Sequence, residues 1–118
     1  MPKESPLVTK SYTFSLAIIK LCTKLQAAKQ FVIAKQLLSS GTSVGANIEE
    51  ATQATTKPDF ISKISISLKE AHETRYWLRL VRDSGILPAS ETTIKQLIED
   101  IHEIIRMLVA SLKTARSR

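Results

Sequence analysis

Apolar residues recur at helical spacing in four segments of the chain. The first segment carries Phe14, Ile18, Leu21 and Leu25. Their intervals of four, three and four residues place them on one face of a helix. The inward positions of the second segment, about residues 30–55, and of the third are Ala34, Leu37, Leu38, Val44, Ile48 and Ala51, then Ile61, Ile64, Leu68, Ala71, Leu78 and Val81. The fourth segment has the widest stripe, with Ile94, Leu97, Ile101, Ile104 and Leu108 flanked by Ile98, Ile105, Val109 and Leu112.

Residues typical of helix ends separate these segments. Pro58 ends the second segment, because proline cannot continue a helix and the residue before it disfavours one. Pro58 and Asp59 in turn suit the first turn of a third helix. Gly85 suits the C-terminal cap of that helix. Ser90 is a good N-cap for a fourth helix, with Glu91 in its first turn.

Four helices with short connections predict an all-α fold, an antiparallel up-down four-helix bundle. We expect residues 1–118 to form a single domain, with flexible tails at residues 1–10 and 114–118. The stripe of the fourth segment is wide for a helix with a single neighbour, which is typical of a helix inside a bundle or of one that also packs on another subunit.

The run Ser39–Asn47 permits two interpretations. It holds Gly41 and Gly45, and each glycine inside a helix costs about 1 kcal/mol relative to alanine. The helix breaks at Gly41 and restarts with Asn47 as N-cap and Glu50 in capping-box spacing, or it continues and the glycines let another helix approach closely. Local rules leave both open. A phosphate loop is disfavoured, since the run lacks a lysine and follows no strand.

Charge adds a hypothesis about partners. The chain has 17 Lys and Arg against 11 Asp and Glu, a net charge of +6. Residues 1–29 hold five lysines against one glutamate, and no acid follows Glu103. This asymmetry favours a polyanion or an acidic protein as partner.

Other sequence features bound the class of protein. No apolar run approaches the roughly 18 residues of a membrane span, and the first ten residues lack a signal-peptide pattern. Cys22, the single cysteine, lies among apolar residues and is interpreted as a small core residue. We therefore expect a cytoplasmic protein without membrane contact.

The only candidate metal pair is Glu99 with His102, a Glu-x-x-His spacing used by di-iron bundles. Such a site requires a second pair, but the other histidine, His72, has Lys69 where the glutamate should be. No nucleophile-and-base set occurs with a glycine-rich turn. We therefore expect no metal, no cofactor and no catalytic residues, so the protein is not expected to be an enzyme.

A second informative patch lies near the end of the third segment. Arg75, Arg79 and Arg82 share one helical stripe, and Tyr76 and Trp77 interleave with them. The structural interpretation puts the aromatic side chains in the core and pairs Arg79 with Asp83 at the surface. The functional interpretation is an anion-facing stripe, because arginine and aromatic side chains suit phosphate contact and base stacking. We favour the structural interpretation for the aromatic side chains and the functional interpretation for the arginines.

Two ordered stretches carry a family resemblance. The first runs from Ser43 to Ala51 (SVGANIEEA), and the second comprises Asp59-Phe60-Ile61-x-Lys63 and SLKEAHETRYWL at 67–78. They resemble the four helix bundle protein family, which is the family of 23S rRNA intervening-sequence proteins. This family includes the accessory variability determinant of diversity-generating retroelements. The similarity extends over about residues 12–113.

The resemblance implies an up-down bundle that assembles as a homopentamer and has no catalytic residues. It further implies nucleic acid and a reverse transcriptase as partners of the retroelement member. It favours a continuous second helix and gives packing roles to Gly41, Gly45, Asn47, Glu50, Tyr76 and Trp77. Asn47 and Glu50 are expected to hydrogen-bond toward Arg75 or Tyr76.

The leading hypothesis is therefore a basic, oligomeric accessory protein that binds the backbone of RNA or DNA without strong sequence specificity. The candidate nucleic-acid-binding residues are Lys20, Lys24, Arg75, Arg79, Arg82, Lys113 and Arg116. The alternatives are a scaffold for an acidic protein such as a reverse transcriptase, or a structural oligomer.

Overall fold

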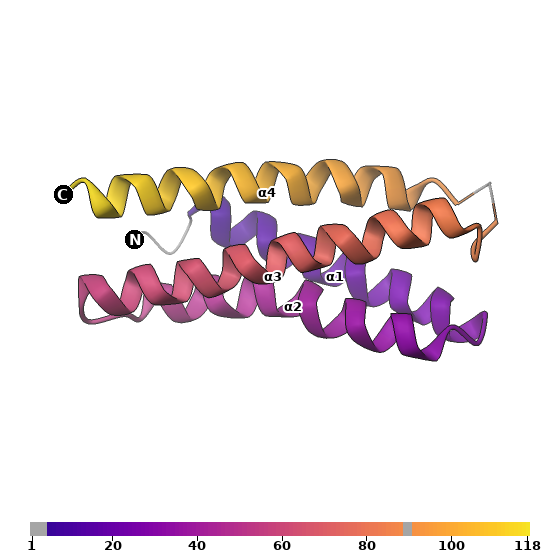
Figure 1. Ribbon diagram of the computed structural model, residues 1–118. Coiled ribbons are helices and arrows are strands. Elements are labelled where there is room, and N and C mark those ends of the chain that lie inside the picture. The colour runs from indigo at the N-terminus through magenta and orange to yellow at the C-terminus, as the bar shows by residue number, and fades with distance from the viewer. Residues whose placement is uncertain (1–4, 89–90) are drawn as a thin grey trace.

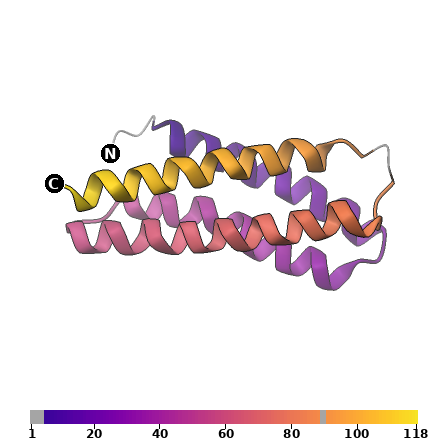
Figure 2. The same ribbon diagram turned by 45° about the horizontal axis from the view of Figure 1, so that its top comes forward.

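The computed structural model describes residues 5–88 and 91–118, which form four α-helices (Figure 1). They are α1 (Pro6–Ala27), α2 (Phe31–Thr52), α3 (Lys57–Ser84) and α4 (Thr93–Arg116). Each helix packs antiparallel to the next, and α4 returns to α1. The bundle measures 47 × 22 × 20 Å, and Figure 2 shows α1 crossing behind α4 at an angle. The predicted up-down four-helix bundle is confirmed.

The helices extend further into the expected tails than the sequence indicated. α1 begins at Pro6, inside the expected flexible tail 1–10, and α4 continues to Arg116, inside the expected tail 114–118. Leu7 and Leu112 are buried in the core. Because these two side chains anchor the end turns, helical order reaches almost to both ends of the described chain.

The third helix begins and ends where its local residues predict. The Thr56 hydroxyl accepts a hydrogen bond from the Asp59 amide at 3.2 Å, so it caps the first turn, and Pro58 lies in that turn. Gly85 follows the helix with φ of 71°, the left-handed conformation in which glycine has no side-chain penalty.

The start of the fourth helix differs from the prediction. The expected N-cap, Ser90, lies outside the described residues, and α4 begins only at Thr93. Glu91 therefore precedes the helix instead of lying in its first turn. Its carboxylate accepts hydrogen bonds from the Thr93 amide, at 3.3 Å, and from the Thr93 hydroxyl. A carboxylate just before the helix thus bonds an amide that has no partner inside the helix.

The wide stripe of α4 is used within the chain. Its buried residues are Ile94, Leu97, Ile98, Ile101, Ile104, Ile105, Leu108 and Leu112. The burial agrees with the first alternative, a helix inside a bundle, and of the stripe only Val109, whose side chain is 48% exposed, remains at the surface. α4 packs against both α1 and α3, so a broad stripe covers two neighbours. Apolar as it is, neither α4 nor any other described helix has the length and hydropathy to cross a bilayer.

The second helix is continuous through both glycines. A Cβ atom at Gly41 would lie 2.9 Å from Cγ2 of Ile18, and one at Gly45 would lie 3.3 Å from the backbone oxygen of Ser11. Both glycines therefore allow a close approach between α2 and α1 of the same chain. Contacts with another subunit are not needed to explain them.

Small polar side chains join α2 to α3 inside the bundle. The buried Ser67 hydroxyl donates to the backbone oxygen of Val44 at 2.8 Å. The Thr74 hydroxyl lies 3.1 Å from that of Ser40 and 2.8 Å from the backbone oxygen of Glu70. Because these hydroxyls are bonded, their burial costs little, and they fix the register of the two helices.

Candidate functional site

The arginine stripe of α3 lies along the side of that helix that faces α4. Arg79 and Arg82 are exposed and Arg75 is half-buried. The spacing of four and three residues keeps the three guanidinium groups on one line. Leu68 lies about two turns further back on the same line and lines a pocket with α4 residues, which fixes the direction in which the stripe faces.

A second row of cations lies on the flank of α4 that faces α3. Val109 and Lys113 line the same pocket as Leu68 and therefore mark this flank. Lys95, Arg106 and Lys113 follow one another at intervals of 11 and 7 residues, so helical periodicity places them on nearly the same line. All three are exposed.

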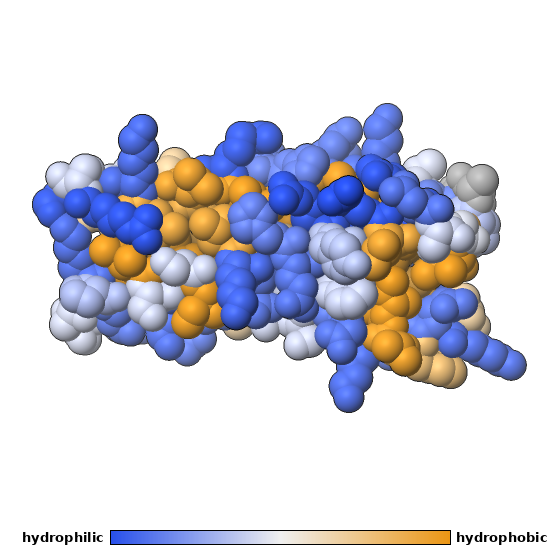
Figure 3. Space-filling view, in the orientation of Figure 1, coloured by the Kyte–Doolittle hydropathy of each residue, from blue (hydrophilic) through white to orange (hydrophobic). Residues whose placement is uncertain are grey.

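These two rows form a surface that we call the basic seam, defined by Arg75, Arg79 and Arg82 of α3 and by Lys95, Arg106, Lys113 and Arg116 of α4. Both histidines of the chain, His72 and His102, lie on the same flanks. Among the described residues, the acids on these flanks are Asp83 and Glu99, of which Glu99 lines a hollow together with Lys95, and Glu103 lies further toward the outward side of α4. Figure 3 shows strongly hydrophilic side chains at both ends of this face with an apolar stretch between them. The seam therefore carries concentrated positive charge.

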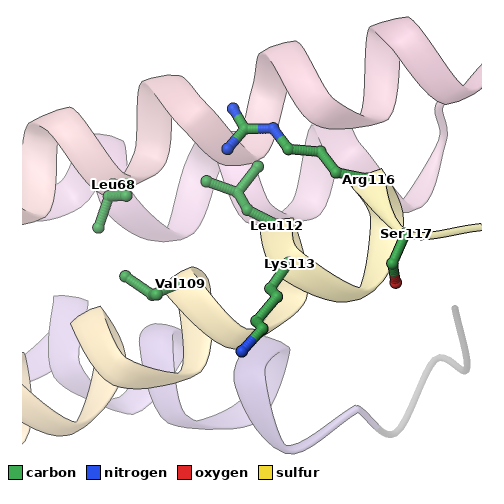
Figure 4. Close-up of a pocket in the computed structure, with 6 residues that line it drawn as sticks. All are labelled: Leu68, Val109, Leu112, Lys113, Arg116 and Ser117. Carbon is green, nitrogen blue, oxygen red and sulfur yellow. The ribbon is translucent and has the colours of Figure 1, made fainter.

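One end of the basic seam is hollowed into a pocket of about 440 Å³ (Figure 4). Leu68, Val109 and Leu112 form its apolar floor, and Lys113 and Arg116 stand at its rim. The Arg116 side chain extends toward α3, whereas that of Lys113 points away from it. Two cations above an apolar floor suit a ligand with an anionic edge.

Hydrogen bonds fix part of the arginine stripe. Arg82 bonds both carboxylate oxygens of Asp83, at 2.7 and 3.2 Å, and this hydrogen bonding lowers the pKa of Asp83. The expected Arg79–Asp83 pair is therefore wrong, because Arg82 occupies the carboxylate. A guanidinium nitrogen of Arg75 lies 3.1 Å from Nδ1 of His72. Arg79 is exposed and forms no hydrogen bond or salt bridge to another described side chain, so it is left as the free cation of the α3 row.

The structure does not bring Lys20 and Lys24 to the basic seam. Both belong to α1, which packs against the other side of α4. The Lys24 ammonium lies 2.8 Å from a carboxylate oxygen of Glu91. This hydrogen bond, together with those from Thr93, lowers the pKa of Glu91. Lys24 thus joins α1 to the start of α4, and Lys20 is exposed on a different face.

The aromatic side chains of α3 are not in the core. Tyr76 is 52% exposed, and Trp77 is half-buried against the core, so the structural interpretation is wrong for Tyr76 and only partly right for Trp77. The two rings meet edge to face with centroids 5.3 Å apart. The indole nitrogen of Trp77 donates to Glu73 at 3.2 Å. The pair is therefore held at the surface beside the arginine stripe.

The motif residues of α2 have other partners than expected. The Asn47 amide donates to the backbone oxygen of Ser43 at 2.9 Å, within its own helix. Glu50 lies 3.7 Å from the ammonium of Lys63. The expected hydrogen bonds toward the side chains of Arg75 or Tyr76 are therefore wrong. Asn47 instead reaches the backbone oxygen one turn earlier in its own helix, which still has a free lone pair.

Residues considered for metal or thiol chemistry have ordinary surroundings. Glu99 and His102 are exposed on α4. Cys22 is buried, as its apolar neighbours predict, and burial raises the pKa of its thiol to about 11. The thiolate, which is the reactive form, is therefore scarce at neutral pH.

Sequence reasoning missed Lys95 and Arg106, two members of the basic seam. The signal in the sequence was the spacing of both residues from Lys113, which is close to a whole number of helical turns. What could not be read from the sequence is that this flank of α4 faces the arginine stripe of α3. That pairing depends on which helices are neighbours.

Comparison with known proteins places the chain among relatives. A family model described as 23S rRNA-intervening sequence protein matches residues 3–110. The crystal structure of a protein of unknown function from the S23 ribosomal protein family of Bacteroides thetaiotaomicron is similar, with a TM-score of 0.84 and 40% sequence identity. The match covers 91% of this chain and 98% of that one. No curated protein sequence matches significantly.

Proposed function

The chain belongs to the 23S rRNA-intervening sequence protein family, and we propose that it is a non-catalytic protein that binds nucleic acid through the basic seam. In this proposal the cations of the seam pair with backbone phosphates of RNA or DNA, and binding depends little on base sequence. The family description concerns inserts in ribosomal RNA, which makes structured RNA the first ligand to test.

The observation that carries the proposal is the separation of charge on the surface. Seven cations lie on two adjoining helix flanks, where the described acids are Asp83, which is paired with Arg82, and Glu99 beside Lys95. Some acidic residues elsewhere are paired with other lysines, as in the contacts of Lys10 with Asp100 and Glu103. Arg82 apart, the cations of the seam form no salt bridge within the described part of the chain, and such an array suits a polyanion better than a small anion.

The decisive experiment is a fluorescence titration of structured RNA at rising salt. Each neutralised phosphate releases counterions, so log K falls with log salt by about 0.9 per phosphate contact on a duplex. A variant that carries Arg79→Gln and Lys113→Gln should lower this slope by about two, one for each lost contact.

A matched control removes the same charge elsewhere. Lys20→Gln combined with Lys35→Gln takes two exposed cations from α1 and α2 and should leave the salt slope nearly unchanged. If both pairs of substitutions lower the slope equally, overall charge rather than the basic seam drives binding. Absent or salt-insensitive binding of the unmodified protein would sink the proposal.

We further propose self-association through the outer face of α1. Tyr12, Leu16 and Ile19 are 59%, 47% and 46% exposed and follow one another at helical spacing. An exposed apolar stripe of this kind favours burial against another copy, and the pentamer implied by the family resemblance is the expected assembly. Leu16→Glu should convert the assembly into the 13.1 kDa monomer in sedimentation, whereas Val109→Glu on α4 should not. A wild-type protein that sediments as a monomer at micromolar concentration would exclude this part of the proposal.

A further inference from the structure

An exposed apolar patch borders the arginine stripe at the end of the bundle where α3 stops and α2 begins. Phe31 and Val32 of α2 are 62% and 79% exposed, and Tyr76 and Leu80 of α3 are 52% and 39% exposed. With the half-buried Trp77 they form what we call the aromatic patch. Figure 3 shows an apolar band crossing from α3 toward α2 at this end.

The bundle core does not account for the aromatic patch. Phe31, Val32 and Tyr76 remain largely in solvent, so they contribute little to the hydrophobic stabilisation of the fold, whereas Trp77 packs partly against the core. Phe31, Val32, Trp77 and Leu80 line one hollow of about 480 Å³ between α2 and α3. Contiguous exposed apolar surface of this kind marks a contact site more often than chance.

The aromatic rings are positioned in advance. Trp77 is held by its hydrogen bond to Glu73 at 3.2 Å, and the Tyr76 ring rests edge to face against it with centroids 5.3 Å apart. A ring fixed before binding loses little conformational entropy when a flat group stacks on it. Tyr76 also precedes Arg79 by three residues, so the two side chains are neighbours on the helix surface.

We propose that unpaired nucleobases stack on Tyr76 and the adjoining aromatic patch while their phosphates contact Arg75 and Arg79, so that the protein prefers single-stranded segments. The inference rests on the proposed nucleic-acid binding and names the ligand class more narrowly. In a duplex the bases are stacked on one another and show only their edges in the grooves, so the aromatic patch has no partner there. In a single strand the base faces are available to aromatic side chains.

Charge favours this occupant over a second copy of the chain. The aromatic patch adjoins the arginine stripe, and a second copy that covered it would bring its own cations close to those of the basic seam. A single strand offers phosphates to the arginines and flat apolar faces to the rings at the same time. Both kinds of contact lie within the width of one helix, about 10 Å.

The test compares three oligonucleotides of the same length, about 12 nucleotides, by fluorescence anisotropy. The first kind is a single strand without self-complementarity, made both as RNA and as DNA. The second is the same strand paired with its complement, and the third is an abasic strand that keeps the phosphates. Tyr76→Ala should weaken single-strand binding by about 5- to 150-fold, the range of one stacked base. Duplex and abasic binding should not change, and the salt slope should stay as in the unmodified protein.

Two variants control for indirect effects. Tyr76→Phe keeps the ring and should bind the single strand like the unmodified protein. Ile66→Ala removes another exposed apolar side chain of α3, 41% exposed and outside the aromatic patch, and should also have no effect. Far-ultraviolet circular dichroism of each variant serves to check that it is folded.

Other outcomes overturn the inference in distinguishable ways. If Tyr76→Ala binds the single strand normally, stacking on this ring is wrong although phosphate binding stands. If it weakens all three ligands equally, the side chain acts on the structure of the basic seam. If it changes the sedimentation of the protein and not its binding, the aromatic patch is a contact between copies. If no oligonucleotide binds in a salt-dependent way, the proposed function itself fails.

Discussion

The close approach of α1 and α2 at Gly41 gives a prediction with a definite sign. Alanine at this position should gain about 1 kcal/mol from helix propensity, yet its Cβ would lie 2.9 Å from Cγ2 and 3.1 Å from Cγ1 of Ile18. Ile18 is fully buried and β-branched, so its χ1 angle has little freedom to yield. Overpacking of a core costs about 1–3 kcal/mol. Gly41→Ala should therefore lower the free energy of unfolding by about 1 kcal/mol, the difference between a cost of about 2 and the gain of about 1.

The cause can be isolated by repeating the substitution in an Ile18→Ala background. The clash is then absent, and Gly41→Ala should raise the free energy of unfolding by about 1 kcal/mol. The two backgrounds thus differ by about 2 kcal/mol, a coupling within the range for residues in contact. Ile18→Ala itself costs about 2–5 kcal/mol, so unfolding is followed in urea by far-ultraviolet circular dichroism. A Gly41→Ala protein that is more stable than the unmodified chain would refute the reasoning.

Three further predictions concern single groups. Glu91 has a lowered pKa in the folded state, so its stabilising contribution is present above its unfolded pKa of about 4.3 and is lost as the pH falls through the folded value. Glu91→Gln should therefore cost about 0.2–1 kcal/mol near neutral pH, and in urea unfolding its difference from the unmodified protein should shrink as the pH falls below about 4.3. The buried Cys22 thiol, with its pKa raised to about 11, should resist a disulfide reagent at about pH 8 until denaturant is added, and stoichiometric labelling of the native protein would contradict its placement. Ser67→Ala should cost about 1 kcal/mol in urea unfolding, because it removes the buried bond to Val44, whereas Ser43→Ala, whose bond stays within α2, should cost less. Equal costs for the two serines would argue against a role for the interhelical bond.

The helices and most of the core could be predicted from the sequence because apolar periodicity reports burial directly. Phe14, Leu37, Leu78 and Leu108 are buried as their spacing predicts. Prediction was weaker where one residue admits two environments. Packing rather than local propensity explains why α2 is helical at its glycines. Gly41 lowers the helix propensity of the segment, yet it allows α1 to approach closely. Only the family resemblance favoured that interpretation before the structure was described.

The candidate site was less predictable, because it depends on pairs of helices. The arginine stripe could be read from spacing within α3, but its continuation on α4 requires the knowledge that α3 and α4 are neighbours with their flanks in register. Lys24 illustrates the same difficulty in reverse. Its charge suggested a ligand, yet a partner 67 residues away in the chain, Glu91, occupies its ammonium. Net charge counts such lysines equally with free ones, whereas only unneutralised cations contribute to binding a polyanion.

The order of helices around the bundle also explains how two binding surfaces can coexist. α1 packs against α2 and α4 but makes no close approach to α3, so it lies diagonally across from the arginine stripe. A second copy packed on Leu16 and Ile19 therefore leaves the α3 row of the basic seam open. If both proposals hold, each assembly presents several seams joined rigidly together. A long polyanion that leaves one seam then meets the next at high effective concentration, so the affinity of the assembly exceeds that of its parts without any new contact. A weak, sequence-tolerant seam on a small bundle is sufficient for tight binding in that case, because self-association rather than a deep pocket supplies the additional affinity.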